Sequence, residues 1–180
     1  MKNNIRKRID ASLVSSLDKN NIGKSLMHDE IPLLGQGLFW QDLDPGQRFR
    51  TFRRTITEAD LIHFIGVTGQ TEVIFIDADY PGAIKGGRPV PSALTYSLIE
   101  GILMQTLLQN VGLALLELQQ VIKAPVLVGD SVQAVVQITD VRPTSKSGRA
   151  VVTQQVTVSN QDAVVVMEYS VKRLLAGRPA

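Results

Sequence analysis

The sequence contains no cysteine. Disulfide bonds, thiolate nucleophiles and cysteine-ligated zinc are therefore excluded, and a reducing compartment such as the cytoplasm is favoured. Only two histidines are present, His28 and His63. A histidine-based metal site cannot be assembled from so few ligands, so we expect no metal.

Strong charge and long apolar runs are also missing. The formal net charge is only +2, which is too small an excess of Lys and Arg to indicate a nucleic-acid partner. The most apolar stretch, residues 93–108, is interrupted by polar side chains and falls short of the ~20 apolar residues that a membrane span requires. The basic start of the chain is not followed by an apolar run, so we expect neither a secretion signal nor a membrane protein.

What is present indicates a soluble globular protein. The chain has 180 residues, of which 44% are hydrophobic and 20% charged, and this is enough to bury one proper core. Residues 1–37 are dominated by polar and charged side chains, whereas short, punctuated elements begin at Leu38. We therefore expect an N-terminal extension, residues 1–37, and a single domain, residues 38–180.

The first half of this domain predicts a strand over Arg48–Ile56 and then a short helix capped by Thr57. A loop rich in glycine and proline follows over 70–91. Ser92 is the predicted N-cap of a long helix over 93–110. Because this helix is apolar around most of its circumference, we expect it to be enclosed on nearly all sides.

The second half switches to the period of two that is typical of half-buried strands. The strands are expected over 113–122, 131–140, 149–159 and 163–171, joined by links short enough for hairpins. One long helix against a curved antiparallel sheet is an α+β architecture, the single hotdog fold. Its open sheet edges predict at least a dimer.

Several segments, in order along the chain, resemble the MaoC-like acyl dehydratases and (R)-specific enoyl-CoA hydratases. The resemblance covers roughly 38–175. It implies a hotdog fold that acts on or binds an acyl-CoA thioester in fatty acid metabolism, with coenzyme A as part of the substrate and no separate cofactor. The matching segments are Thr55-Ile56-Thr57-Glu58-Ala59-Asp60-Leu61, Thr68-Gly69, Asp77, Gly86-Gly87-Arg88-Pro89-Val90, Leu94-Thr95 and Pro125-Val126-Leu127-Val128-Gly129-Asp130.

The resemblance also places the catalytic positions, and two of them are changed. The family's aspartate and histidine, which activate water for addition to an enoyl-CoA, correspond here to Gln70 and Phe75. Neither can take a proton at neutral pH. Glu72 lies between them and is either a substitute base or a loop carboxylate that is solvated or paired with Arg88. Ser92 takes the place of the family's glycine whose N–H polarises the thioester carbonyl.

The remaining candidate residues each have more than one interpretation. Glu100 is the only carboxylate in the apolar helix, so it must find a partner, water or a substrate. It could serve a hotdog thioesterase, with Tyr96 as a hydrogen-bond donor, or it could pair across a dimer interface or point outward. Cationic side chains could hold the coenzyme A phosphates or form a solvated face: Arg54, Lys85 and Arg88. Three functions stay open: a hydratase or dehydratase, an acyl-CoA thioesterase, and a non-catalytic acyl-CoA-binding subunit, as a homodimer or paired with an active homologue.

Overall fold

The structure is a computed structural model that describes residues 33–81, 84, 86–145 and 148–179. The chain divides into two units, Met1–Leu34 and Gly35–Ala180, and the second contains every element discussed below. Most of the predicted N-terminal extension, residues 1–37, lies outside the described residues, so its boundary stays a prediction. No helix among the described residues is long and apolar enough to cross a membrane.

The order of the predicted elements is confirmed, with three elements more than expected: one strand, the 3-10 helix η1, and the short helix α4 inside the predicted loop 70–91. The segment predicted as one strand over Arg48–Ile56 forms two short strands, because Thr51 bonds Ala134 of the neighbouring strand through both its main chain and its hydroxyl. The elements are η1 (Trp40–Asp42), β1 (Arg48–Arg50), β2 (Arg54–Thr55), α3 (Glu58–Thr68), α4 (Val73–Ile76), α5 (Ser92–Met104), β3 (Gly112–Ile122), β4 (Ser131–Pro143), β5 (Arg149–Ser159) and β6 (Val165–Ala176).

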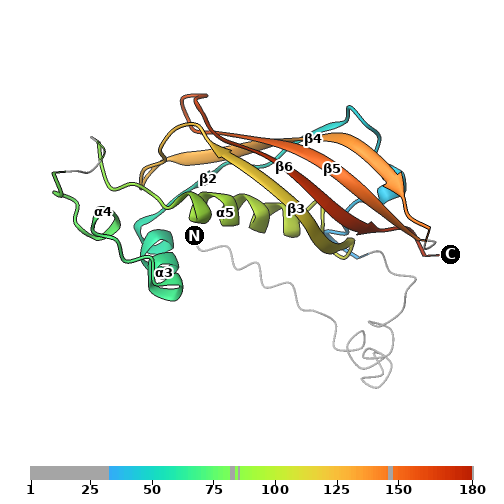
Figure 1. Cartoon of the computed structure of the whole chain (residues 1–180), viewed down its shortest axis with the longest axis horizontal. Helices are drawn as coiled ribbons and strands as arrows, with labels where there is room; N and C mark the ends of the chain where they lie inside the picture. Colours follow the sequence, from blue (N-terminus) through green and yellow to red (C-terminus); the bar gives the residue numbers. More distant parts are fainter. Residues whose placement is uncertain (1–32, 82–83, 85, 146–147, 180) are drawn as a thin grey trace, which may run out of the picture. The chain divides into compact units, whose positions relative to one another are not determined.

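The strands form one antiparallel sheet in the order β1-β4-β5-β6-β3, with β2 paired to β4. Alternate residues of β4, β5 and β6 are buried, as expected for strands with one face on a core. Figure 1 shows α5 lying along the concave side of this curved sheet, with α3 and α4 beyond its N-terminal end. The predicted α+β hotdog architecture is confirmed.

Helix α5 differs from the prediction at both ends. Pro91, not Ser92, is the N-cap, because the Pro91 carbonyl accepts the first helical bonds, from the N–H groups of Leu94 and Thr95. Ser92 is the first helical residue. The helix ends at Met104 and not at Asn110, because residues 105–111 fold into turns that return the chain to the sheet.

The prediction that α5 is enclosed on nearly all sides is wrong for the single chain. One face is buried against the sheet, but the opposite face carries exposed Ser92, Ala93, Ser97 and Met104. The hydrophobicity of α5 is therefore greater than its contacts within one chain require.

Gly37 holds the start of the domain against the turn that follows α5. Its N–H donates to the Gln109 carbonyl at 2.9 Å, and Leu38 N–H donates to the Leu107 carbonyl at 3.0 Å. A Cβ atom at position 37 would lie 2.6 Å from the Leu107 carbonyl oxygen and 2.7 Å from that of Gln109. The backbones approach too closely for any side chain.

We therefore expect Gly37→Ala to lower the free energy of unfolding by about 1–3 kcal/mol, the usual range for overpacking. Gly101→Ala is the matched control, because a Cβ there meets nothing within 4 Å and alanine favours a helix. Urea titration of both variants measures the difference. Equal stability of the two variants would contradict the close approach at Gly37.

Candidate functional site

The glycine-rich segment before α5 is held in an extended path beside Val126–Val128. Val90 N–H donates to the Val126 carbonyl at 2.7 Å, and Val128 N–H donates to the Arg88 carbonyl at 3.1 Å. Gly86 and Gly87 have φ values of +113° and +147°, which side chains rarely adopt. This short ladder fixes where α5 begins.

The start of α5 presents free backbone donors. Ser92 and Ala93 are exposed, and their N–H groups donate to no carbonyl among the described residues. The first N–H groups of a helix lack partners within the helix and carry the positive end of its dipole. This end of α5 can therefore stabilise negative charge that develops on an oxygen atom.

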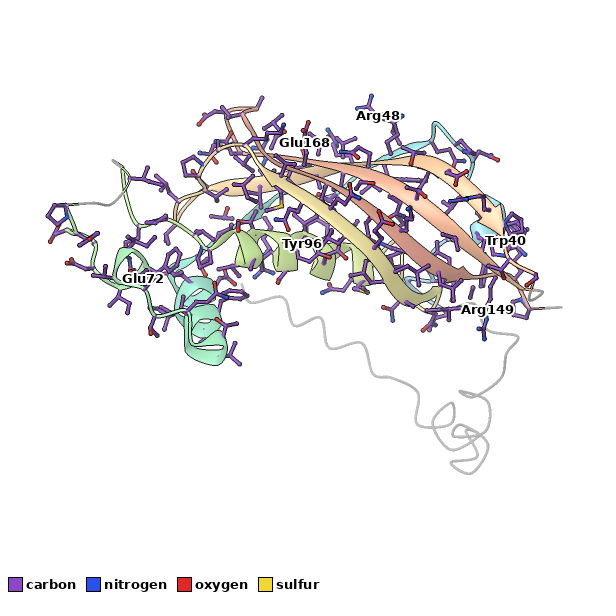
Figure 2. The ribbon with its side chains drawn as sticks, in the orientation of Figure 1. Trp40, Arg48, Glu72, Tyr96, Arg149 and Glu168 are labelled. Carbon is purple, nitrogen blue, oxygen red and sulfur yellow. The ribbon has the colours of Figure 1, made fainter. Side chains whose placement is uncertain are left out.

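The loop between α3 and α4 holds the three changed or substitute positions. Gln70 and Glu72 are exposed, whereas Phe75 lies in α4 and packs half-buried against the core. Glu72 is the N-cap residue of α4, and its side chain makes no cap hydrogen bond. Figure 2 shows Glu72 at the α3–α4 end of the molecule. The structure leaves the Glu72 carboxylate without an ion-pair partner in the described part of the chain.

The arginines proposed for phosphate binding are engaged with α3. Arg54 pairs with Asp60 at 2.7 Å, and Arg88 pairs with Glu58. Arg88 also donates to the Ile76 carbonyl at 3.4 Å, which ties the loop to α3. The alternative pairing of Glu72 with Arg88 is therefore wrong. Lys85 lies outside the described residues.

Asp60 completes a capping box at the start of α3. Its carboxylate accepts from the Thr57 N–H at 2.8 Å, and its own N–H donates to the Thr57 hydroxyl at 3.2 Å. Burial alone would raise the pKa of Asp60, but the hydrogen bonds from Thr57 and Arg54 outweigh it and lower the pKa. Asp60 thus stays ionised and keeps Arg54 occupied.

Glu100 is part of a buried ion pair within the chain. Both of its carboxylate oxygens lie 2.7 Å from Arg173 Nη2, and Oε1 also accepts from the Tyr169 hydroxyl at 2.9 Å. Arg173 Nε donates to the Gln154 side-chain oxygen at 3.1 Å. The carboxylate that was a candidate thioesterase base is therefore already neutralised by a cation and a hydroxyl.

Arg173 and Gln154 were missed from the sequence. The predicted last strand stopped at Val171, two residues before Arg173, although β6 continues to Ala176. The sequence did indicate this position, because Tyr169, Val171 and Arg173 are alternate residues of one strand and therefore share its buried face. Gln154 likewise interrupts an otherwise apolar inward face of β5, and its amide nitrogen has no partner in the described part of the chain.

Tyr96 joins this network from one turn earlier on α5. Its ring meets that of Tyr169 edge to face, with centroids 5.3 Å apart and planes at 74°. Burial and the nearby Glu100 carboxylate raise the pKa of both tyrosines, so both keep their protons. Figure 2 shows Tyr96 on α5 beneath the strands. At 1.5 Å per residue, Glu100 lies roughly 12 Å along the helix from Ser92, so the ion pair is separate from the helix start.

Apart from Ser92 and the cationic side chains, the predicted site residues fall into two groups. Gln70, Glu72 and Phe75 share the loop and helix beyond the start of α5, whereas Tyr96 and Glu100 lie farther along α5 and face the sheet. Across the described ranges, no three His, Asp or Glu side chains gather as a metal site needs.

A family model described as the FAS1-like dehydratase domain region matches residues 44–169. The chain belongs to this family. The match spans most of the hotdog domain of this FAS1-like dehydratase-region protein, and it supports the resemblance to MaoC-like dehydratases. The assignment of Gln70 and Phe75 to the family's catalytic positions stays a prediction. Comparison with the sequences of characterised proteins finds no match.

Solved structures share the fold of this FAS1-like chain. A MaoC-like dehydratase from Rhodospirillum rubrum is 23% identical, with a TM-score of 0.71 over 80% of this chain and 100% of that one. The (R)-hydratase PhaJ1 from Pseudomonas aeruginosa is 20% identical, with a TM-score of 0.66 over 79% and 88%. A double-hotdog protein from Mycobacterium tuberculosis is 18% identical, with a TM-score of 0.71 over 79% and 45%.

The Glu100–Arg173 pair predicts a large and non-additive effect on stability. Glu100→Gln removes one charge and leaves Arg173 buried without a counter-ion, which should cost about 3–5 kcal/mol. The double variant Glu100→Leu with Arg173→Met should recover most of that loss, because it removes both desolvated charges. Urea unfolding of Glu100→Leu, Arg173→Met and their double variant measures the coupling.

The outward-facing pair of Lys172 and Glu117 is the matched control. These side chains lie 2.5 Å apart but are 37% and 42% exposed, so Glu117→Gln should cost less than about 1 kcal/mol. Similar losses for Glu100→Gln and Glu117→Gln would mean that Glu100 is not held by Arg173.

Proposed function

We propose that this protein binds an acyl-CoA thioester, an enoyl-CoA or 3-hydroxyacyl-CoA, with the thioester carbonyl at the N-terminal end of α5. The observation that carries the proposal is the exposed helix start, where the Ser92 and Ala93 N–H groups have no acceptor among the described residues. Membership of a dehydratase-region family, and structural relatives named as a MaoC-like dehydratase and an (R)-hydratase, support the same substrate class.

The reaction we propose is reversible addition of water across the double bond. The helix-start N–H groups would stabilise the enolate oxygen, because that oxygen gains charge when a nucleophile adds to the enoyl group. Glu72 would take a proton from the attacking water as its oxygen bonds the β-carbon, and would return that proton to the α-carbon as the enolate collapses to the thioester. It would thus substitute for the acid–base pair changed at Gln70 and Phe75. Its free carboxylate on the neighbouring loop supports this role.

Hydrolysis of the thioester by Glu100 is the weaker alternative. A general base must have a lone pair free to accept a proton from water, and Glu100 accepts from Arg173 and Tyr169 instead. The third function, binding without catalysis, needs only the helix start and remains a distinct outcome of the assay.

We expect crotonyl-CoA and longer enoyl-CoAs to lose their conjugated double bond in the presence of the protein, with no release of thiol. Glu72→Gln should lower kcat by at least about a hundredfold, the usual contribution of a general base. Absorbance of the enone and a thiol reagent, followed in parallel, separate the outcomes. Asp77→Asn is the control, since this exposed carboxylate at the other end of α4 has no assigned role.

Other results would replace the proposed reaction. Thiol release without loss of the double bond would establish a thioesterase. If neither the enone absorbance nor the thiol signal changes, and calorimetry still shows acyl-CoA binding, the protein is a non-catalytic binder. Absence of acyl-CoA binding would refute the proposal as a whole.

We also propose that the protein forms a homodimer through β3. This strand lies at one end of the sheet order, so one of its edges is unpaired. Every β3 residue except Leu118 is exposed, and five are large and apolar: Leu113, Leu115, Leu116, Val121 and Ile122. An open, apolar edge strand favours pairing with a second copy of itself.

Leu116→Glu should therefore shift the protein from dimer to monomer in sedimentation equilibrium, because it places two like charges across a symmetric interface. Val164→Glu is the matched control: Val164 is similarly exposed, at 47% against 54% for Leu116, but lies in the β5–β6 turn. A wild-type protein that sediments as a monomer at all concentrations would refute the dimer.

A further inference from the structure

A cavity of about 430 Å³ opens between β1 and the C-terminal end of α5. Its size falls in the range of small-molecule sites, which are usually 300–1,000 Å³ and mostly apolar. Apolar side chains make up most of its lining: Leu38, Phe49, Phe52, Ile102, Leu103, Leu107 and Val136.

The cavity is distinct from the proposed thioester site. Its helical wall is Ile102 and Leu103, roughly 15 Å along α5 from Ser92. Its other wall is β1, which lies at the opposite end of the sheet order from β3. Neither the helix start nor the proposed dimer edge contributes a lining residue.

The lining of the cavity is poor in charged residues. Arg50 is the only charged residue in the lining, but successive side chains of a strand point to opposite faces. Phe49 packs against the core while Arg48 and Arg50 are exposed, and Figure 2 shows Arg48 on the outer side of the sheet. The Arg50 side chain therefore lies on the exposed side of β1, on the face opposite to Phe49.

Neutral polar groups remain in the lining. The Thr51 hydroxyl is buried and accepts from the Ala134 N–H at 2.9 Å, so its own proton is available to an acceptor. The Gln105 side chain is exposed and makes no hydrogen bond within the described part of the chain. These groups can hold one uncharged oxygen atom, whereas a charged head group would lose its hydration without a counter-ion.

We propose that this cavity is a second binding site, for an elongated, uncharged aliphatic molecule that carries a single hydroxyl or carbonyl oxygen. The volume of the cavity limits the size of the ligand. An apolar cavity of about 150 Å³ holds one benzene, so 430 Å³ holds a chain on the order of ten carbons. The oxygen lies near Thr51 or Gln105, and the chain packs between Phe49, Ile102 and Leu103.

The test uses 1-octanol and octanoate, which share a chain length and differ in charge. Calorimetry on the full-length protein should show one octanol site per chain, with octanoate binding at least about tenfold more weakly. Equal binding of the two compounds would overturn the assignment to uncharged ligands. An absence of octanol binding would overturn the site itself.

Two variants locate the site. Phe52→Ala removes an apolar wall and Gln105→Trp fills the mouth, so both should weaken octanol binding by at least about fivefold. Ile62→Ala is the matched control for Phe52→Ala, because Ile62 is similarly exposed, at 47% against 56%, but lies in α3 outside the lining. Octanol binding that neither Phe52→Ala nor Gln105→Trp weakens would place the ligand elsewhere. Thermal melting of each variant separates lost binding from lost folding.

A competition experiment separates this site from the proposed function. Crotonyl-CoA should leave the octanol affinity unchanged, and Gln105→Trp should leave crotonyl-CoA binding unchanged. Displacement of octanol by crotonyl-CoA would show that the cavity belongs to the thioester site and would overturn the claim of a second site. A protein that binds octanol but no acyl-CoA would refute the proposed function alone.

Discussion

The burial of α5 against the concave face of the sheet is the constraint on which the rest of the structure depends. The helix carries Glu100 into the core, where an isolated carboxylate would be very costly. Arg173 on β6 neutralises it through two short contacts, and Gln154 and Tyr169 complete the hydrogen bonding from β5 and β6. Arg173 Nη2 contacts both carboxylate oxygens while its Nε donates to Gln154, so the guanidinium plane is held at two points. It therefore fixes the rotation and the axial position of α5 as well as its attachment.

Once α5 is fixed, the position of its first turn follows from the segment before it. Gly86 and Gly87 adopt conformations that side chains disfavour, and they let the chain run beside Val126–Val128 to Pro91. Arg88 joins that segment to α3 through Glu58. The donors at the helix start are backbone groups, so they persist whatever the side chain at position 92. The helix start can therefore stabilise negative charge even though Gln70 and Phe75 cannot act as an acid and a base.

The order of elements could be predicted because each has a clear period. Strand β5 alternates buried with less buried residues along its whole length, and β4 does so from Ser131 to Ile138. Thr57 and Asp60 form the cap that their spacing indicates. The ends of α5 could not be predicted, because Pro91 and Ser92 are both acceptable at a helix start, and apolar Leu107 and Leu108 continue the helical pattern into a turn. The alternation of β6 does place Arg173 on the inward face, but the sequence does not show that this position on the sheet meets Glu100 on α5.

The ion pair also determines whether a ligand at one end of α5 can influence binding at the other end. It lies between the helix start, which offers backbone N–H groups, and the last turn, where Ile102 and Leu103 wall the apolar cavity. A ligand at one end could influence the other by sliding or rotating the helix, and either movement would stretch the contacts of Arg173 with Glu100. Breaking a buried ion pair costs more than most small ligands could return through differential binding. The same interaction that lets an apolar helix carry a charge into the core therefore favours independent binding at its two ends.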